Sequence, residues 1–76
     1  MRKEKFKMER PNLVKKGDEV EITEYANGNL YSYIIKPAVA MSGIYKTQER
    51  IQDRKGIVDE VMETERGFYV IVEFQK

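Results

Sequence analysis

Alternating apolar and polar positions are the clearest regularity in this chain, and they are strongest in residues 13–37, LVKKGDEVEITEYANGNLYSYIIKP. Runs rich in Val, Ile, Thr and Tyr flank Asn27-Gly28, and this pattern predicts two strands joined by a tight turn. Asn-Gly suits a two-residue type I′ loop because both central residues there need positive φ. We therefore expect a β-hairpin in which Ala26 pairs with Asn29.

This register would sort the side chains of the hairpin onto two faces. One face pairs Val20 with Ile35, Ile22 with Tyr33 and Glu24 with Tyr31, and the other pairs Tyr25 with Leu30, Thr23 with Ser32 and Glu19 with Lys36. The first face is mostly apolar, while the second carries a hydroxyl pair and an opposite-charge pair. A slip of one residue would exchange the two faces, which supports the register. A turn at Lys16-Gly17-Asp18 would lead into the hairpin, and Pro37 would end it.

The C-terminal stretch, residues 57–74, predicts a second hairpin. Its apolar side chains that we expect in the core are Val58, Met62, Phe68, Val70, Val72 and Phe74. A three-residue loop at Glu65-Arg66-Gly67 would put glycine in the left-handed position. That loop pairs Met62 with Val70 and Val58 with Phe74, but it also sets Asp59 against Glu73, a like-charge pair that is unfavourable. Loops of two or four residues are therefore alternatives.

Two other segments carry weaker patterns. Residues 4–9, EKFKME, alternate and predict a first strand ended by Pro11, with a basic N-terminal arm over residues 1–10 as the alternative. Residues 38–41 could extend a strand beyond the first hairpin. After Ser42-Gly43, helical spacing links Ile44, Tyr45, Gln48, Ile51 and Gln52. We expect a long ordered loop with one short helix in the 38–55 connection, because a stretch of that length without any structure is unusual in a small domain.

Together these elements predict an all-β fold. The expected architecture is a small five-stranded SH3-like barrel over residues 11–76, with an OB-like barrel as the alternative. A length of 76 residues allows one domain with a modest core.

The composition excludes most catalytic and metal chemistry. The chain has no Cys and no His, so it lacks disulfides, thiolates, imidazole ligands and the side chain most used in general acid–base catalysis. It also has no phosphate-cradling glycine loop, nucleophile motif or alternating acidic loop. We therefore expect a non-enzymatic protein with no cofactor, no metal and no small-molecule substrate.

The hydropathy of the chain gives no sign of a membrane segment. No apolar run approaches the roughly 20 residues that span a bilayer. The basic N-terminus lacks the apolar stretch of a signal peptide. We therefore expect a cytoplasmic protein that does not enter the membrane.

Charge is unevenly distributed although the net charge is only +1. Residues 1–16 carry seven Lys or Arg against two Glu, and residues 46–56 carry four against two acids. Residues 17–45 and 57–76 are each acidic on balance. The chain could therefore present a basic face to a polyanion, although mixed surface charge is also ordinary in soluble domains.

Two fragments resemble parts of SH3-like barrels of the KOW kind, which occur in ribosomal proteins and transcription elongation factors. KKGDEVEI, residues 15–22, resembles the strand that opens such domains, and RKGIVDEV, residues 54–61, resembles the glycine-centred step that follows. In those families this region often contacts RNA or protein, so the resemblance implies contacts at Lys15, Lys16, Arg54 and Lys55. In a KOW motif the two glycine elements lie close in sequence, whereas here a whole hairpin and a further connection separate Gly17 from Gly56.

Protein binding, by an accessory or interaction module, is the function that we expect first. A small barrel offers edges and loops for a protein partner or for self-association, and a cluster of Tyr25, Leu30, Tyr69 and Ile71 would be a candidate apolar interface. RNA binding through a basic face is the alternative, although a near-neutral chain is unusual for a dedicated nucleic-acid binder. The candidate contact residues for a nucleic acid or another partner are Lys15, Lys16, Lys46, Arg50, Arg54 and Lys55.

Overall fold

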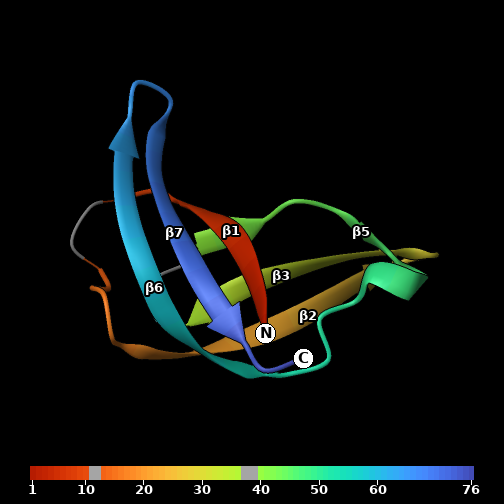
Figure 1. Cartoon of the computed structure of the whole chain (residues 1–76). Coiled ribbons are helices and arrows are strands. Elements are labelled where there is room, and N and C mark those ends of the chain that lie inside the picture. Colours follow the sequence, from red (N-terminus) through yellow and green to blue (C-terminus); the bar gives the residue numbers. More distant parts are fainter. Residues whose placement is uncertain (11–12, 37–39) are drawn as a thin grey trace.

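Seven strands and one 3-10 turn form the part of the chain that the computed structural model describes, residues 1–10, 13–36 and 40–76. They are β1 (Arg2–Met8), β2 (Glu19–Asn27), β3 (Leu30–Lys36), β4 (Ala40–Ser42), β5 (Tyr45–Lys46), η1 (Thr47–Glu49), β6 (Lys55–Thr64) and β7 (Gly67–Phe74). Six strands close a ring in the order β2-β6-β7-β1-β4-β3 and back to β2, and β5 pairs with β3 beside this ring (Figure 1). The all-β barrel is thus confirmed.

The ring has six strands where the sequence predicted five: the four hairpin strands and the N-terminal strand β1 were expected, and β4 is the additional one. Strand β1 pairs with β7 over its whole length and with β4 at Phe6↔Ser42 and Lys7↔Met41. The N-terminal segment is therefore a strand of the barrel wall and not a separate arm. Its alternation explains why, because Phe6 and Met8 are buried while Lys5 and Lys7, which alternate with them, face outward.

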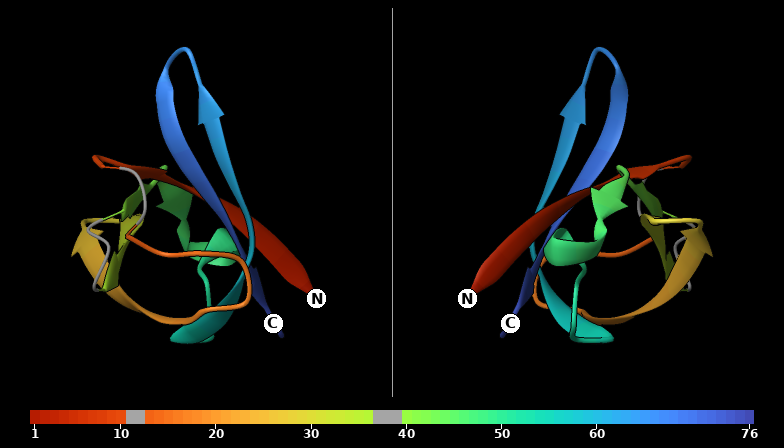
Figure 2. Two further views of the ribbon diagram at one scale, coloured as in Figure 1. Left: turned by 90° about the vertical axis from the view of Figure 1, so that its left-hand side faces the viewer. Right: turned by 90° about the vertical axis from the view of Figure 1, so that its right-hand side faces the viewer.

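The core fills the interior of this ring. Its buried side chains are Phe6, Met8, Val14, Val20, Ile22, Tyr33, Ile35, Ala40, Ile51, Val58, Val70, Val72 and Phe74. Every strand of the ring contributes to it, and the views in Figure 2 show these strands curving around a shared interior while the β6–β7 hairpin extends past the rest. Burial of apolar area on one face of every strand is what closes such a small sheet.

The first hairpin forms, but its register differs from the predicted one by two residues. Asn27 pairs with Leu30 and Ile22 pairs with Ile35, so the loop is Gly28-Asn29 and not Asn27-Gly28. Gly28 takes the positive φ, +63°, that the tight loop needs. A shift of two residues keeps each side chain on its own face, and therefore the predicted apolar face is buried in spite of the wrong pairs.

The second hairpin has the two-residue loop, Glu65-Arg66, that was one of the alternatives. Thr64 pairs with Gly67 next to the loop. A β-bulge between Val58 and Glu60 shifts the pairing by one residue in the part of the hairpin that lies farther from the loop. The bulge separates the predicted like-charge pair of Asp59 and Glu73. The ammonium group of Lys3 on β1 lies 3.3 Å from the first of these carboxylates and 4.0 Å from the second, which offsets their repulsion.

The bulge also changes the predicted core of this hairpin. Val58, Val70, Val72 and Phe74 are buried as expected, and Phe68 packs partly buried against them. Met62 was predicted in the core, but it pairs with Tyr69 on the outer side of the barrel. One extra residue in β6 reverses the alternation beyond it, which the sequence pattern did not indicate.

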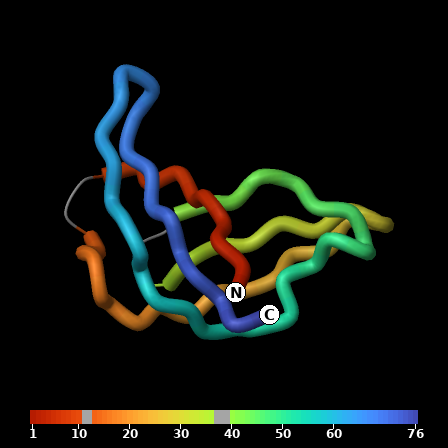
Figure 3. The backbone as a smooth tube through the Cα atoms, in the orientation of Figure 1, coloured from red at the N-terminus to blue at the C-terminus, as the bar shows by residue number. Residues whose placement is uncertain are grey.

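The connection between β4 and β6 contains less helix than its spacing allowed. Instead of two turns of amphipathic helix, it holds β5 and the single 3-10 turn η1. Ile51, which is 1% exposed, follows this turn and enters the core, and the chain then crosses one end of the ring to reach β6 (Figure 3). The strand predicted over residues 38–41 is confirmed at Ala40 and Met41, which belong to β4. Residues 38 and 39, and the strand ends predicted at Pro11 and Pro37, lie outside the described residues.

Candidate partner-binding face

The two fragments that resemble KOW elements lie side by side in the barrel, although a hairpin separates them in sequence. Val20 pairs with Gly56 in the β2–β6 ladder, and the amide of Gly17 donates to the carbonyl oxygen of Val58 at 2.8 Å. Gly56 is buried and has no room for a side chain. An added Cβ would lie 2.6 Å from a methyl carbon of Val72 and 2.9 Å from the carbonyl oxygen of Glu73. Close packing of β6 on β7 therefore accounts for this glycine without any ligand.

The basic residues beside these glycines do not converge. Lys55 pairs with Glu21 at one end of the β2–β6 ladder, whereas Lys16 precedes the turn at Gly17, whose amide bonds to Val58 beyond the other end. The acidic side chain of Glu19 is exposed between them. Lys15-Lys16 and Arg54-Lys55 thus occupy opposite ends of the ladder and do not form one basic face.

Arg50 and Arg54 converge on a single carboxylate, Glu24 of β2. The guanidinium of Arg50 makes two hydrogen bonds to it, at 2.6 and 3.0 Å, and lies 4.4 Å from the ring centroid of Tyr31. Arg54 approaches the same carboxylate at 3.6 Å and donates to the carbonyl oxygen of Ile51. These two candidate contacts are therefore already engaged within the barrel.

The phenol of Tyr33 completes this group of contacts. Its hydroxyl donates to the carboxylate of Glu24 at 2.6 Å and accepts the backbone N–H of Ile51 at 2.9 Å. The hydrogen bond from Arg50 is the main cause that holds the pKa of Glu24 below its usual value, against the opposing effect of desolvation. Burial, followed by the hydrogen bond to Glu24, raises the pKa of Tyr33. The ion pair and the neutral phenol together attach the 3-10 connection to β2 and β3.

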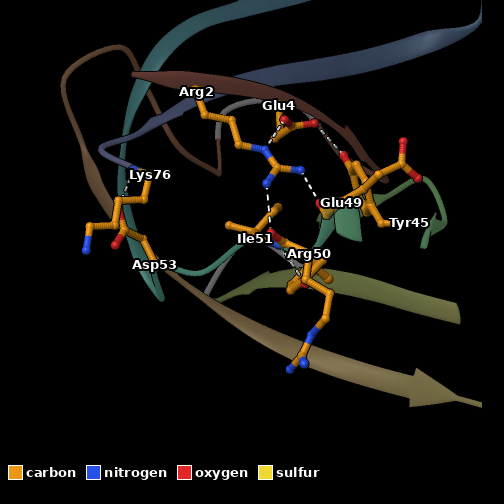
Figure 4. A network of polar contacts seen from close by, with 9 residues as sticks. Arg2, Glu4, Tyr45, Glu49, Arg50, Ile51, Asp53 and Lys76 are labelled. Atoms are coloured by element: carbon orange, nitrogen blue, oxygen red, sulfur yellow. Dashed lines mark hydrogen bonds and ion pairs between the residues drawn. The ribbon is translucent and has the colours of Figure 1, made fainter. Parts of the chain in front are cut away.

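A second group of contacts attaches the same connection to β1 (Figure 4). Arg2 pairs with Glu4 at 2.5 Å and donates to the backbone carbonyl oxygens of Glu49 and of Arg50, the latter at 2.8 Å. The hydroxyl of Tyr45 donates to Glu4 at 2.7 Å, and burial raises the pKa of this phenol. Arg2 therefore serves the fold rather than a ligand.

The described residues, 1–10, 13–36 and 40–76, contain no cluster of three or more acidic side chains suited to a metal ion. Every buried side-chain nitrogen or oxygen in those ranges has a hydrogen-bond partner. No helix within them is long and apolar enough to cross a membrane.

The outer side of β2, β3 and β4, together with the link between β4 and β5, presents large apolar side chains to solvent. We call this the apolar face, and it consists of Tyr25, Leu30, Ile34, Met41 and Ile44. The exposed fractions are 50% for Tyr25, 45% for Leu30, 51% for Met41 and 72% for Ile44, and Ile34 is partly buried. The other exposed large apolar side chains, Met1, Leu13, Ile57 and Val61, come from separate parts of the described chain.

Strand alternation explains why these residues face outward together. Tyr33 and Ile35 point into the core, so Leu30 and Ile34 on the same strand point out. Tyr25 pairs with Ser32 between them, and Met41 pairs with Ile34. Leu30 and Ile34 are four residues and about 13 Å apart along β3, with Ser32 between them on the same side, and Tyr25 lies beside this serine on β2.

A row of cross-strand pairs continues from the apolar face around the barrel wall. Met41 pairs with Lys7 of β1, Lys7 pairs with Tyr69 of β7, and Tyr69 pairs with Met62 of β6. Lys5 lies on the same side of β1, with its ammonium group 4.3 Å from the ring centroid of Tyr69. The apolar face is thus bordered by two outward-facing lysines.

A shallow groove of about 450 Å³ lies where β1 and β4 separate. Its walls are formed by Glu4, Lys5, Lys7, Met41, Ser42, Gly43, Tyr45 and Tyr69. A Cβ atom added at Gly43 would meet no atom within 4 Å, so the groove is open there. Met41 belongs to both the groove and the apolar face, which makes the two surfaces contiguous.

Lys46 and two residues of the predicted apolar cluster lie on or beside the apolar face, and the other two residues of that cluster lie apart from it. Lys46 pairs with Leu30 and is exposed at the margin of the apolar face. Tyr25 and Leu30 lie on that face, whereas Tyr69 and Ile71 are partly buried beyond β1. The predicted cluster of these four residues is therefore divided by the lysines of β1.

Sequence reasoning missed three members of the apolar face, Ile34, Met41 and Ile44. Ile34 follows from the predicted alternation of its strand. Met41 lies in the stretch predicted as a possible strand extension, and Ile44 begins the stretch with helical spacing. Lys5 and Lys7 stood out only as part of a basic segment. Their shared orientation follows from the alternation of Phe6 and Met8.

Comparisons with protein-family models, with curated proteins and with solved structures find no match for this chain. The KOW resemblance of the two glycine fragments therefore gains no support from a relative. A functional hypothesis for this barrel has to be argued from its surface.

Proposed function

We propose that this barrel is a non-enzymatic accessory module that binds a protein partner through the apolar face. The observation that carries the proposal is the exposure of four large apolar side chains, 45–72% each, on one side of the sheet. Contiguous apolar surface of this kind marks interaction sites in soluble proteins. A standard interface covers about 800 Å² per partner, roughly 15% of the 5369 Å² surface of this chain, which is the scale of one sheet face.

The closed ring reduces, but does not remove, the edges that a partner strand could join. Each ring strand has neighbours on both sides, but among the described strands residues 59–64 of β6 pair only with β7, because the β2–β6 ladder ends at Ile57. Addition of a partner strand would use such an unpaired edge. We place the partner on the side chains of the apolar face instead, with Lys46 at its margin, because large apolar side chains are exposed together there.

The strand order supports an OB-like arrangement more than the SH3-like one. Without β1, the ring is a five-stranded barrel that is open between β4 and β7, and β1 fills this opening. OB barrels are partly open, five-stranded and Greek-key, and they bind ligands on their second and third strands. Those strands correspond to β3 and β4, which carry Leu30, Ile34 and Met41. This analogy supports the location of the site and does not identify its ligand.

RNA binding is the weaker alternative for this surface. Phosphate binding draws its affinity from clustered cations, but Lys15-Lys16 and Arg54-Lys55 lie apart, and Arg50 is paired with Glu24. Stacking of bases needs open aromatic faces, whereas the ring of Tyr69 is already covered by Lys5.

A peptide selection followed by mapping tests the proposal. Peptides selected from a random displayed library against the immobilised barrel would be titrated into ¹⁵N-labelled protein. We expect the amide resonances of Leu30, Met41 and Ile44 to shift. Leu30→Lys would abolish the binding, while Leu13→Lys, a leucine of similar exposure (41% against 45%) outside the apolar face, would preserve it. Shifts confined to other surfaces, or equal loss in both variants, would refute the assignment.

A further inference from the structure

The cations of β1 differ in their surroundings, and two of them lack an acidic neighbour. Arg2 is paired with Glu4, and Lys3 lies between Asp59 and Glu73. Lys5 and Lys7 come within 4.0 Å of no carboxylate oxygen in the described part of the chain. Both face the groove beside Met41. This short stretch of wall therefore carries two cations without an ion pair, and Glu65 and Arg66 line the neighbouring hollow beside Lys5 and Tyr69.

The groove combines those charges with apolar walls. Met41 and Tyr69 flank Lys7 as its cross-strand neighbours on either side. The acid among the lining residues, Glu4, has a side chain only 18% exposed and is engaged by Arg2 and Tyr45. It therefore offers little compensation to the two lysines. A ligand with an acidic group next to an apolar one would match both the charge and the surface of this groove.

Among the classes of macromolecule, an acidic protein segment fits best. Two cations are few for a nucleic-acid backbone, whose affinity grows with each phosphate that is neutralised. A protein segment needs only one or two carboxylates here, because most of its contact area would lie on the adjoining apolar face. The open position at Gly43 leaves room for a chain to pass from one surface to the other.

We infer that the partner presents an extended segment whose apolar side chains cover the apolar face and whose aspartate or glutamate side chains meet Lys5 and Lys7. This inference rests on the proposed function and adds the chemical class of the partner. The lysines set the selectivity and the salt dependence of binding, and the apolar face provides most of the affinity.

Short peptides selected against the apolar face provide the probe. The inference predicts that they are enriched in Asp and Glu beside Leu, Ile or Phe. It also predicts that replacing their acids by Asn and Gln weakens binding about tenfold, equivalent to about 1.4 kcal/mol. Raising NaCl from about 0.05 to about 0.5 M would weaken binding of the acidic peptide, because salt screens its charges, and would not weaken binding of the peptide with Asn and Gln in place of the acids.

Matched charge reversals identify the residues responsible. Lys5→Glu combined with Lys7→Glu should lower the affinity for the acidic peptide about tenfold, as measured by fluorescence anisotropy. Lys15→Glu combined with Lys16→Glu should leave this affinity unchanged. Both double variants have the same net charge, so a general electrostatic effect would change them equally. A ¹⁵N spectrum of each variant would establish that the barrel is folded.

The possible results separate this inference from the proposed function. Loss of binding in Leu30→Lys with no change in the Lys5/Lys7 variant would leave the proposed function intact and overturn the acidic partner. Equal weakening in both lysine pairs would overturn it as well. Tighter binding of a labelled oligouridylate than of the acidic peptide would assign the groove to nucleic acid. Dimerisation in sedimentation, lost in the Lys5/Lys7 variant, would make a second copy of this chain the occupant.

Discussion

Two groups of cationic side chains in this barrel have opposite surroundings. At the end of the ring, Arg2 and Arg50 are bound by carboxylates and by backbone carbonyl oxygens of the connection that covers the core. On the outer wall, Lys5 and Lys7 have no acidic neighbour within 4.0 Å among the described residues. The same formal charge therefore has two roles. A cation with an acid beside it organises the fold, and we propose that a cation without one meets a partner.

The same contrast extends to apolar and phenolic side chains. Ile51 fills the core while Ile44 is 72% exposed, and the hydroxyl of Tyr33 is enclosed while Tyr25 is half exposed. Each pair offers one residue from the end of the ring and one from the apolar face. Identical substitutions in the two members can test whether the first region maintains stability and the second only binds.

The largest effect is expected for isoleucine truncation. Ile51→Ala should lower the free energy of unfolding by about 2–4 kcal/mol, because it leaves a cavity beneath the connection. Ile44→Ala should change it by less than about 0.5 kcal/mol. Urea denaturation followed by circular dichroism measures both values. Similar losses in the two variants would contradict the division into regions.

Removal of a hydroxyl should have the next largest effect. Tyr33→Phe takes away the acceptor of the Ile51 amide and a donor to Glu24, so we expect a loss of about 1–3 kcal/mol. Tyr25→Phe, on the same hairpin, should be neutral. Amide hydrogen exchange of Ile51 should accelerate in the first variant only, and an unchanged rate would show that this hydrogen bond is dispensable.

The carboxylate of Glu24 should give the barrel a dependence on pH. Its folded pKa is lowered, chiefly by the hydrogen bond from Arg50, so the stabilisation is complete above the ordinary value near 4.5 and is lost as the pH falls through the folded pKa. Glu24→Gln should therefore lower stability at pH 7 by about 1–2 kcal/mol and flatten its decline in acid. Glu21→Gln, exposed on the same strand, is the control. Parallel acid profiles for wild type and Glu24→Gln would disprove this role.

The smallest effect on stability is expected at the outer lysines. Lys5→Gln and Lys7→Gln should each leave the free energy of unfolding within about 0.5 kcal/mol of the parent, since neither breaks an ion pair. Thermal unfolding measures this. A larger loss would place these lysines with Arg2 and Arg50 as structural residues, and their proposed part in binding would then need another explanation.

The two hairpins show how far alternation carries a prediction. Alternation assigned the buried face of β2 and β3 correctly even though the loop was displaced from Asn27-Gly28 to Gly28-Asn29. It failed at Met62, because the bulge next to Asp59 reverses the faces of β6. A bulge depends on how two particular strands cross, and one strand alone does not encode that crossing.

The candidate site was harder to predict than the fold. Lys15, Lys16, Arg54 and Lys55 were selected because they flank glycines, but these glycines serve a turn and a close packing contact. Arg50 was selected for its charge and is used by Glu24. Ile44 was missed because it lies in the stretch with helical spacing, and Met41 was missed because a possible strand over residues 38–41 did not indicate which side chains would face outward.

The sequence by itself determined that this chain is all-β, that two hairpins bury one face each, and that no Cys or His chemistry is available to it. These properties follow from local alternation, turn residues and composition. Tertiary structure alone decided that β1 enters the ring, that Glu24 collects Arg50 and Arg54, and that Lys5 and Lys7 border an apolar face. Those outcomes depend on which strands become neighbours, and closure of a small barrel is a property of all its strands at once.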